Sequence, residues 1–525
     1  MKKVGLIFVI LILAALLPTS ASQASDDPSQ WYMVPLDDPP MPRSGHSLLP
    51  VTDDQNILFG GEDENGVILD DLHVLPNFGN AWSQVPKAGN WPPARSQHTA
   101  WANNDQMYVF GGKNDTQAFN DLWRYDPGLG IWEALVSGGE APPARSAASA
   151  TVLPDGKVLL SGGKDTAGQD LNDTWLYDML TNLWQQKSDA PFSFSGAGSA
   201  FLHNHVLLFA TQPGSGETTV VSYYPPSDFW YVRSYHPDAL RPPALEGAAY
   251  TSDGYKVWMV GGKHQDGTFS DTDWEYNNGS QRWVRRARWQ NFDLQMFWWA
   301  ALFEVTGLKD FCDPDAPDCG QPDTYSAGYG ANTSTATRGL ALFGGLLSTD
   351  VPTNTTFISF PSRGSEILLL PEYDTDLSYS DGQSITTTIQ APAGLVTETT
   401  ILALTASPEI THTLPISSLV PGGLFALGAL TDPLGEPLPG FALSAPITVT
   451  LQYNALRFDE SSLWLVYWNG SQWLDATGTC APAASYERNR DENWLRLPIC
   501  RLGEFALVGT AQNFIYLPLV TRQVP

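Results

Sequence analysis

The stretch that decides the fold is Ala94–Pro127, ARSQHTAWANNDQMYVFGGKNDTQAFNDLWRYDP, with Trp132 after it. The same order of Arg-Ser, Gly-Gly, an aspartate-led aromatic segment and a later tryptophan occurs from Pro42 and from Ala144. Gly-Gly pairs stand at 60–61, 111–112, 162–163, 261–262 and 344–345, and the first two steps are 51 residues each. A period near 50 residues indicates a repeat architecture, in which each repeat is one small sheet.

Short apolar runs end at each glycine pair, as in MYVFGG, KVLLSGG and KVWMVGG. Such runs predict strands that are buried on both faces, and glycine permits positive φ and close backbone approach where each strand stops. DLHVL, DLWRYD and DTWLYD alternate as a third strand should, and the late tryptophan opens a fourth strand that fills space between repeats.

This pattern resembles the kelch-repeat family over roughly residues 30–361. It is well kept in three units, degenerate in the fourth, where Ala210-Thr211 replaces the glycine pair, and weaker in the fifth and sixth. The resemblance implies a β-propeller. We expect six blades, with the N-terminal WYMV at Trp31 supplying the fourth strand of the last blade. The alternative is a propeller of seven blades, with a hidden repeat unit within residues 285–335.

Composition agrees with an all-β protein, a six-bladed propeller followed by a β-sandwich. The 525 residues include 46 Gly and 40 Pro, and only 16% are charged. The net charge of −28 does not favour nucleic-acid binding. The predicted domains are a signal peptide at 1–24, the propeller at 25–364 with an insertion at 285–337, the sandwich at 365–510 and a tail at 511–525.

Met1–Ala24 has the pattern of a secretory signal: Lys2 and Lys3, an apolar stretch of 14 residues, and small residues for cleavage. We therefore expect a secreted or cell-surface bacterial protein with no integral membrane segment after cleavage. The open alternative is an uncleaved membrane anchor.

The region after 365 alternates apolar and Thr residues, as sandwich strands do, and TIQAPAGLVTETTILAL resembles the opening of ZU5-type or immunoglobulin-like sandwich domains through Pro392 and Gly394. The four cysteines form two local pairs, Cys312 with Cys319 and Cys480 with Cys500, which favours disulfides in an oxidising compartment. Four cysteines allow three pairings.

Two groups of residues are candidates for ligand binding at one propeller mouth. Lys113, Lys164 and Lys263 each follow a Gly-Gly pair. Three arginines, Arg43, Arg95 and Arg145, are expected near the same end. The predicted insertion carries Trp298 and Trp299 over this mouth. Such cations could hold an acidic sugar or peptide. The structural alternative is that the lysines pair with local aspartates and the arginines bridge blades.

The remaining candidate residues are judged by their spacing in the sequence. Three aspartates of the insertion, Asp313, Asp315 and Asp318, could bind calcium, which would be the only cofactor. Their spacing fits no EF-hand loop. The alternative is that they lie in a solvated loop closed by a disulfide. We read the NFDLQMFWWAALFEV segment as helical or as an amphipathic lid. His46 and His98 stand in the Arg-Ser-x-His position, where a structural role is expected.

The pattern therefore favours a binding scaffold for a protein or a glycan. The alternative is an enzyme acting on a sugar in the central pocket, similar to galactose oxidase or to kelch propellers that interconvert sialic acid anomers. No copper ligand set of the galactose oxidase kind can be matched here, and no catalytic residue is assigned.

Overall fold

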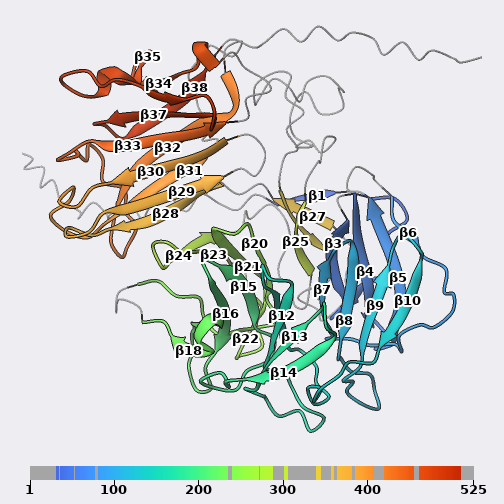
Figure 1. The fold of residues 1–525 in the computed structure, drawn as a ribbon. Coiled ribbons are helices and arrows are strands. Elements are labelled where there is room, and N and C mark those ends of the chain that lie inside the picture. The colour runs from blue at the N-terminus through green and yellow to red at the C-terminus, as the bar shows by residue number, and fades with distance from the viewer. Residues whose placement is uncertain are drawn as a thin grey trace, which may run out of the picture.

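The computed structural model describes residues 31–34, 36–52, 54–76, 81–234, 239–270, 272–287, 301–305, 339–343, 356–359, 363–380, 385–406, 419–453 and 460–509. Within these ranges the regular elements are strands, apart from short 3-10 segments such as η1 (Pro225–Ser227). Figure 1 shows a ring of small sheets and, beside it, a sandwich of two larger sheets.

Six antiparallel sheets in the described residues form the blades of the ring. We number the blades in chain order and give their strands from the innermost outward. Blades one to three contain β3 (Ser47–Thr52), β4 (Gln55–Asp63), β5 (Ile68–Pro76) and β6 (Ser83–Gln84), with β2 (Arg43–Ser44) extending the first; β7 (Thr99–Asn103), β8 (Gln106–Phe110), β9 (Leu122–Asp126) and β10 (Ile131–Leu135); and β11 (Ser149–Val152), β12 (Lys157–Ser161), β13 (Thr174–Asp178) and β14 (Leu183–Lys187).

The second half of the ring has the same order of strands. Blades four to six contain β15 (Gly198–Leu202), β16 (His205–Thr211), β17 (Thr218–Tyr224) and β18 (Phe229–Val232); β20 (Ala249–Ser252), β21 (Lys256–Val260), β23 (Thr272–Asn277) and β24 (Arg282–Ala287), with the small pair β19 (Leu245–Glu246) and β22 (Lys263–His264) beside them; and β25 (Ala301–Val305), β26 (Gly339–Phe343), β27 (Thr356–Ser359) and β1 (Trp31–Val34).

The ring closes on itself. Each innermost strand contacts the innermost strand of the next blade, in the order β3, β7, β11, β15, β20, β25 and back to β3. The last blade is completed by the N-terminal strand, since β1 pairs antiparallel with β27 from Trp31 opposite Ser359 to Val34 opposite Thr356. The prediction of six blades closed by the N-terminus is confirmed. Closure covers the strand edges that an open arc of sheets would expose.

The range predicted as an insertion contains a strand of the propeller. Ala301–Val305, which we expected to be helical or part of a lid, is β25, the innermost strand of blade six. Its first three residues are apolar and continue the tryptophan-rich run before them, so the sequence did not show where the strand begins. The long connection, residues 306–338, therefore runs between the first and second strands of blade six. Residues 288–300 and 306–338 lie outside the described residues, so the expectation that the insertion leans over one mouth of the ring stays a prediction.

In blades one and two, the glycine pair is explained by two close backbone approaches. In blade two, Gly111 and Gly112 have φ of +67° and +88°. A Cβ on Gly111 would lie 2.7 Å from the Arg145 carbonyl oxygen of the next blade, and one on Gly112 would lie 2.9 Å from the Ser96 carbonyl oxygen of its own blade. The Gly112 N–H donates to the Arg145 carbonyl oxygen at 2.9 Å. The pair thus joins neighbouring blades through backbone contacts that only glycine permits.

The late tryptophans pack between blades, as predicted. Trp132 on β10 lies 5.0 Å from Phe59 of the preceding blade and 5.2 Å from Tyr125 of its own blade, between ring centroids. Trp184 repeats this arrangement with Phe110 and Tyr177. Each tryptophan is buried and adds apolar and aromatic contacts between two sheets.

Two antiparallel sheets make up the second domain and enclose one apolar core. One sheet has the order β28 (Arg363–Leu369), β31 (Thr400–Ala406), β32 (Leu419–Thr431), β38 (Gly503–Val508), β34 (Trp464–Trp468) and β35 (Trp473–Asp475). The other has the order β29 (Thr375–Ser380), β30 (Ile385–Ala391), β33 (Ile447–Tyr453), β37 (Trp494–Ile499) and β36 (Glu487–Asn489). The predicted β-sandwich is confirmed.

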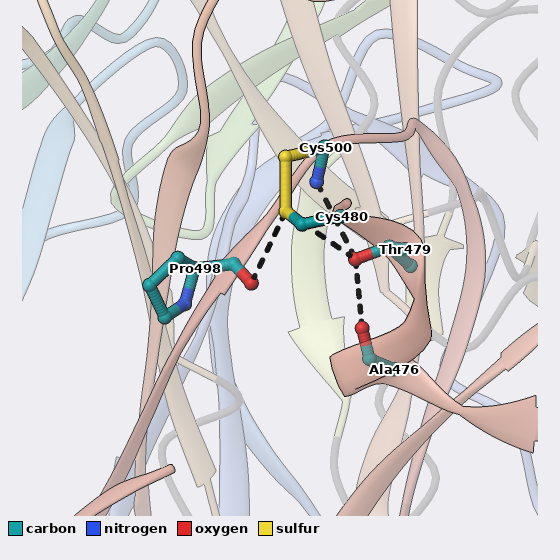
Figure 2. The surroundings of a disulfide bond; sticks show 5 residues. All are labelled: Ala476, Thr479, Cys480, Pro498 and Cys500. Atoms are coloured by element: carbon teal, nitrogen blue, oxygen red, sulfur yellow. Dashed lines mark hydrogen bonds between the residues drawn. A yellow bond between two sulfur atoms is a disulfide. The ribbon is translucent and has the colours of Figure 1, made fainter. Parts of the chain in front are cut away.

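A disulfide between Cys480 and Cys500 links the segment after β35 to the end of β37, and so connects the two sheets (Figure 2). Thr479 braces it, donating from Oγ1 to the Ala476 carbonyl oxygen at 2.7 Å and accepting from the Cys500 N–H at 3.4 Å. The predicted pairing of these two cysteines is confirmed. Cys312 and Cys319 lie outside the described residues.

The sandwich contacts the propeller at blade five. Glu366 of β28 accepts from Arg282 Nη2 at 2.7 Å and from Ser280 Oγ at 2.6 Å. The Tyr255 hydroxyl accepts from the Ser380 N–H at 2.9 Å, and its ring packs 4.9 Å from that of Tyr379. All these groups lie at the end of blade five opposite its Gly-Gly connection, so these contacts leave that connection uncovered.

Candidate functional site

We define the Gly-Gly mouth as the end of the ring formed by the connections between the second and third strands. In the described residues these are segments 62–67, 113–120, 164–172, 212–217 and 263–270. Because successive strands of a blade run antiparallel, all five connections emerge at the same end. They differ in sequence from blade to blade, while the strands that carry them repeat.

Several of these loops are pinned by a polar side chain near their start. The Asp63 carboxylate accepts from the N–H groups of Asn65 and Val67, each at 2.8 Å. Asp165 does the same for Ala167 and Gln169, and Asn114 accepts from the N–H of Thr116 at 2.9 Å. These turns fix the loop backbone before a ligand arrives, which lowers the entropy cost of binding.

The three predicted lysines lie at this mouth but differ in their surroundings. Lys113 is exposed, and no ion pair is formed by its ammonium among the described residues. Lys164 is half-buried and pairs with Asp170 at 2.9 Å. Lys263 lies over the ring of Phe269, 5.2 Å from its centroid. The structure brings the three to one end of the ring, and the structural alternative applies to Lys164, whose partner is Asp170.

The three predicted arginines are buried in equivalent clamps. Arg145 has an exposed fraction of 1%. Its Nη1 and Nη2 donate to the two carboxylate oxygens of Asp173 at 2.7 and 2.6 Å, its Nη1 also donates to the Gly162 carbonyl oxygen at 3.0 Å, and its Nε donates to the Pro143 carbonyl oxygen at 3.1 Å. The clamp thus ties the segment before the first strand to the glycine pair and to the start of the third strand.

The same clamp occurs in blades one and two, where Arg43 binds Asp71 and Arg95 binds Asp121. A ligand at the mouth has no access to guanidinium groups that are this deeply buried, which favours a structural role for all three arginines. Their side chains clamp single blades and do not bridge blades as the structural alternative expected. The sequence contained a signal for this: each arginine is followed after 26 to 28 residues by an aspartate. Sequence reasoning did not connect the two positions.

The aspartates of the clamps are charged at neutral pH. Burial alone would raise the pKa of the Asp173 carboxyl, but hydrogen bonds from Arg145 and Trp175 and the charge of Arg145 hold that pKa below its ordinary value. The pKa values of Asp71 and Asp121 are lowered in the same way. Each clamp is therefore a charged, bidentate pair within the framework.

His98 belongs to the framework as well. Burial and the nearby Arg95 charge lower the pKa of its imidazole to about 3, so the ring is neutral at pH 7. Its Nε2 lies 2.8 Å from the Ser47 hydroxyl of the neighbouring blade. His46 is buried at the equivalent position of blade one. The expected structural role of this position agrees with these contacts.

The remaining candidates lie outside the described residues: Trp298, Trp299, Asp313, Asp315 and Asp318. In the part of the chain that the structure describes, no group of three or more His, Cys, Asp or Glu side chains is arranged to hold a metal ion. Within the same residues, no helix is long and apolar enough to cross a membrane.

Sequence reasoning missed a second link between the blades. The residue after the Arg-Ser pair is in the left-handed region in successive blades, with φ of +64° at Gly45, +54° at Gln97 and +54° at Ala147. The Gln97 N–H donates to the Gly45 carbonyl oxygen at 2.8 Å, and the Ala147 N–H donates to that of Gln97 at 2.7 Å. Because Gln97 and Ala147 are not glycines, the sequence did not indicate a left-handed conformation at these positions.

These features define a β-propeller of six blades joined to a β-sandwich. Residues 27–211 match the family model described as the KLHDC2/KLHL20/DRC7 Kelch-repeats domain. This segment begins before the closing strand and extends through the second strand of blade four.

The chain is also similar to curated kelch proteins. Kelch domain-containing protein 1 of Mus musculus is 29% identical over 171 residues, which is 28% of this chain and 42% of that protein. Rab9 effector protein with kelch motifs of Xenopus laevis is 29% identical over 191 residues, 34% of this chain and 50% of that protein. Adagio protein 3 of Arabidopsis thaliana is 34% identical over 170 residues, 30% of this chain and 27% of that protein. The chain thus spans half or less of the length of these relatives.

Proposed function

We propose that this chain is a secreted or cell-surface interaction scaffold that binds a protein partner at the Gly-Gly mouth of its propeller. The observation that carries the proposal is that the repeated residues have structural roles, whereas the loops of the mouth differ between blades. The repeated arginines and aspartates form clamps within blades, and the glycine pairs and tryptophans make contacts between blades. The loops of the mouth vary between blades and are held by their own side chains.

The relatives support a protein ligand over a glycan at this mouth. Kelch-repeat proteins are typically interaction scaffolds, and one relative is by its name an effector of Rab9. The mouth also mixes charges of both signs, with Lys113 beside Asp115 and Lys164 paired with Asp170. Mixed charge on preorganised loops suits the varied surface of a protein.

Peptides selected from a random displayed library on the intact chain test this proposal. We expect ligands whose affinity falls at least about tenfold, or about 1.4 kcal/mol, when Lys113, Lys164 and Lys263 are all replaced by alanine. A second variant, Asp165→Ala, removes the acceptor that pins one loop and should weaken the same ligands without removing a cation.

A charge-matched control replaces Lys157, Arg490 and Arg501 by alanine. Lys157 lies at the opposite end of blade three and pairs with Asp155, and the two arginines are exposed on the sandwich. Equal losses in the control and in the mouth variant would show a general charge effect and contradict the proposal. A glycan array run on the same proteins reports whether the mouth binds sugars instead, which would also contradict it.

The proposed location rests on the N-terminal pattern of charged and apolar residues in Met1–Ala24 and is supported by the Cys480–Cys500 disulfide. When the full chain is expressed in a bacterium, we expect an exported product whose mass corresponds to a start after residue 24 and whose Cys480 and Cys500 resist alkylation. An intracellular product that retains Met1 would refute this part of the proposal. The likeness of the sandwich to ZU5-type domains stays a prediction.

A further inference from the structure

An aromatic strip lies on blade four, at the end of the propeller opposite the Gly-Gly mouth. It consists of His205, Tyr224, Phe229 and Tyr231, which come from the neighbouring strands β16, β17 and β18. Tyr224 stands opposite Phe229 in the register of β17 and β18. The rings are contiguous: His205 lies 4.9 Å from Tyr224 and 6.1 Å from Tyr231, and Phe229 lies 6.3 Å from Tyr231, between ring centroids.

The strip is open to solvent, and the fold does not require it. Phe229 is 58% exposed and Tyr231 is 37% exposed, whereas Trp230 between them faces the core. The position before the fourth-strand tryptophan is aliphatic in the two preceding blades, where Ile131 and Leu183 stand. Blade four therefore places aromatic rings where other blades do without them. Exposed apolar surface of this kind marks binding sites more often than chance placement.

A fixed cation stands at the end of the strip. Arg233 is on the same side of the chain as Phe229 and Tyr231, because the three alternate along it. Its Nε donates to the Ser222 hydroxyl at 2.6 Å, and its Nη1 donates to the Tyr276 hydroxyl at 3.0 Å and to Asn278 Oδ1 at 2.9 Å. These bonds orient the guanidinium. The Nη2 atom of Arg233 has no hydrogen-bond partner among the described residues. The N–H groups of Nη2 can therefore donate to a ligand.

We propose that this strip binds a carbohydrate that carries a carboxylate group. The C–H faces of sugar rings are apolar and pack on aromatic rings, while the Tyr224 and Tyr231 hydroxyls can exchange hydrogen bonds with sugar hydroxyls. The carboxylate would meet Arg233 Nη2, a charge-assisted contact at a group already held in place. A peptide strand added to the edge of β18 would pair through backbone groups and would make no use of the oriented guanidinium. This site is separate from the proposed protein-binding mouth.

The test is a glycan array that presents carboxylated and neutral saccharides in pairs of equal linkage to the intact chain. We expect retention of carboxylated members, with affinity falling at least tenfold in the double variant Phe229→Ala, Tyr231→Ala. Tyr231→Phe keeps the ring and should retain most of the binding. Arg233→Met should remove the preference for the carboxylated member of each pair.

The matched control is Ile131→Ala, Leu183→Ala, which truncates exposed residues at the equivalent positions of blades two and three and should bind like the parent chain. Urea midpoints of all variants show that the strip variants remain folded. Absence of binding to every saccharide, equal binding by the double variant, or equal retention of neutral and carboxylated members would overturn the proposal. Binding of displayed peptides that vanishes in the double variant would assign the strip to a peptide instead.

Discussion

Replacing Arg145 by methionine is expected to destabilise the propeller by about 3–5 kcal/mol, the usual cost of removing one partner from a buried ion pair. Methionine fills much of the volume but removes the guanidinium donors from the Gly162 and Pro143 carbonyl oxygens and leaves the Asp173 carboxylate with the Trp175 indole N–H as its side-chain donor. The measurement is urea unfolding at pH 7, in which the midpoint should fall while the slope is unchanged.

The control is Arg124→Met in the neighbouring blade. Arg124 pairs with Glu133 at 2.5 Å, but both side chains are exposed to solvent, by 34% and 57%. Exposed pairs of this kind contribute about 0–1 kcal/mol. If Arg145→Met were no more harmful than Arg124→Met, the clamp would not be part of the framework, and its arginines would become candidates for ligand binding again.

The pH dependence of the Arg145→Met effect follows from the lowered pKa of Asp173. A carboxyl whose pKa is lower in the folded state stabilises the fold above its unfolded pKa of about 4, and that contribution is lost as the pH falls through the folded value. The stability difference between the parent chain and Arg145→Met should therefore be largest above about pH 5 and should shrink as the pH falls below 4. A difference that grew in acid would contradict this assignment.

Gly111→Ala is the second substitution expected to have a large effect, with a loss of about 3 kcal/mol or more. Two costs combine. An alanine at φ of +67° costs about 1–2 kcal/mol for its left-handed backbone, and its Cβ would lie 2.7 Å from the Arg145 carbonyl oxygen. Because that oxygen belongs to the backbone of the next blade, relief requires the two blades to separate.

Gly130→Ala separates these two costs. Gly130 has the same φ of +67° in the same blade, but a Cβ there would meet no atom within 4 Å. We expect this variant to lose only the backbone contribution, about 1–2 kcal/mol. Thermal or urea unfolding of both variants gives the comparison, and equal losses would show that close approach between blades does not determine the Gly111 position.

The sequence predicted the parts of the fold that repeat. The glycine pairs, the tryptophans such as Trp132 and the orphan strand at Trp31 were enough to give the number of blades and their closure. These features are visible because each satisfies a local physical need, a positive φ or a large apolar contact, that few residue types can meet. The sandwich followed from its alternating strands, and the Cys480–Cys500 pairing from their proximity in sequence.

What the sequence did not reveal depends on contacts between distant residues. Arg145 and Asp173 are 28 residues apart, and only their pairing shows that the arginine is framework rather than site. The strand Ala301–Val305 has no glycine pair after it, so its place in blade six emerges only from its pairing with β26. The aromatic strip arises from three strands of blade four, and its members carry no shared spacing that a linear reading could detect.

Binding at the Gly-Gly mouth is tested most directly by hydrogen–deuterium exchange of the intact chain, alone and saturated with a peptide ligand selected on it. We expect protection of the Gly-Gly mouth loops, foremost residues 113–120, 164–172 and 263–270, with the hairpins at the opposite end unchanged. Protection confined to those opposite hairpins, at 103–106 and 153–156, or to the sandwich would contradict the claim that the mouth of the propeller is the binding surface.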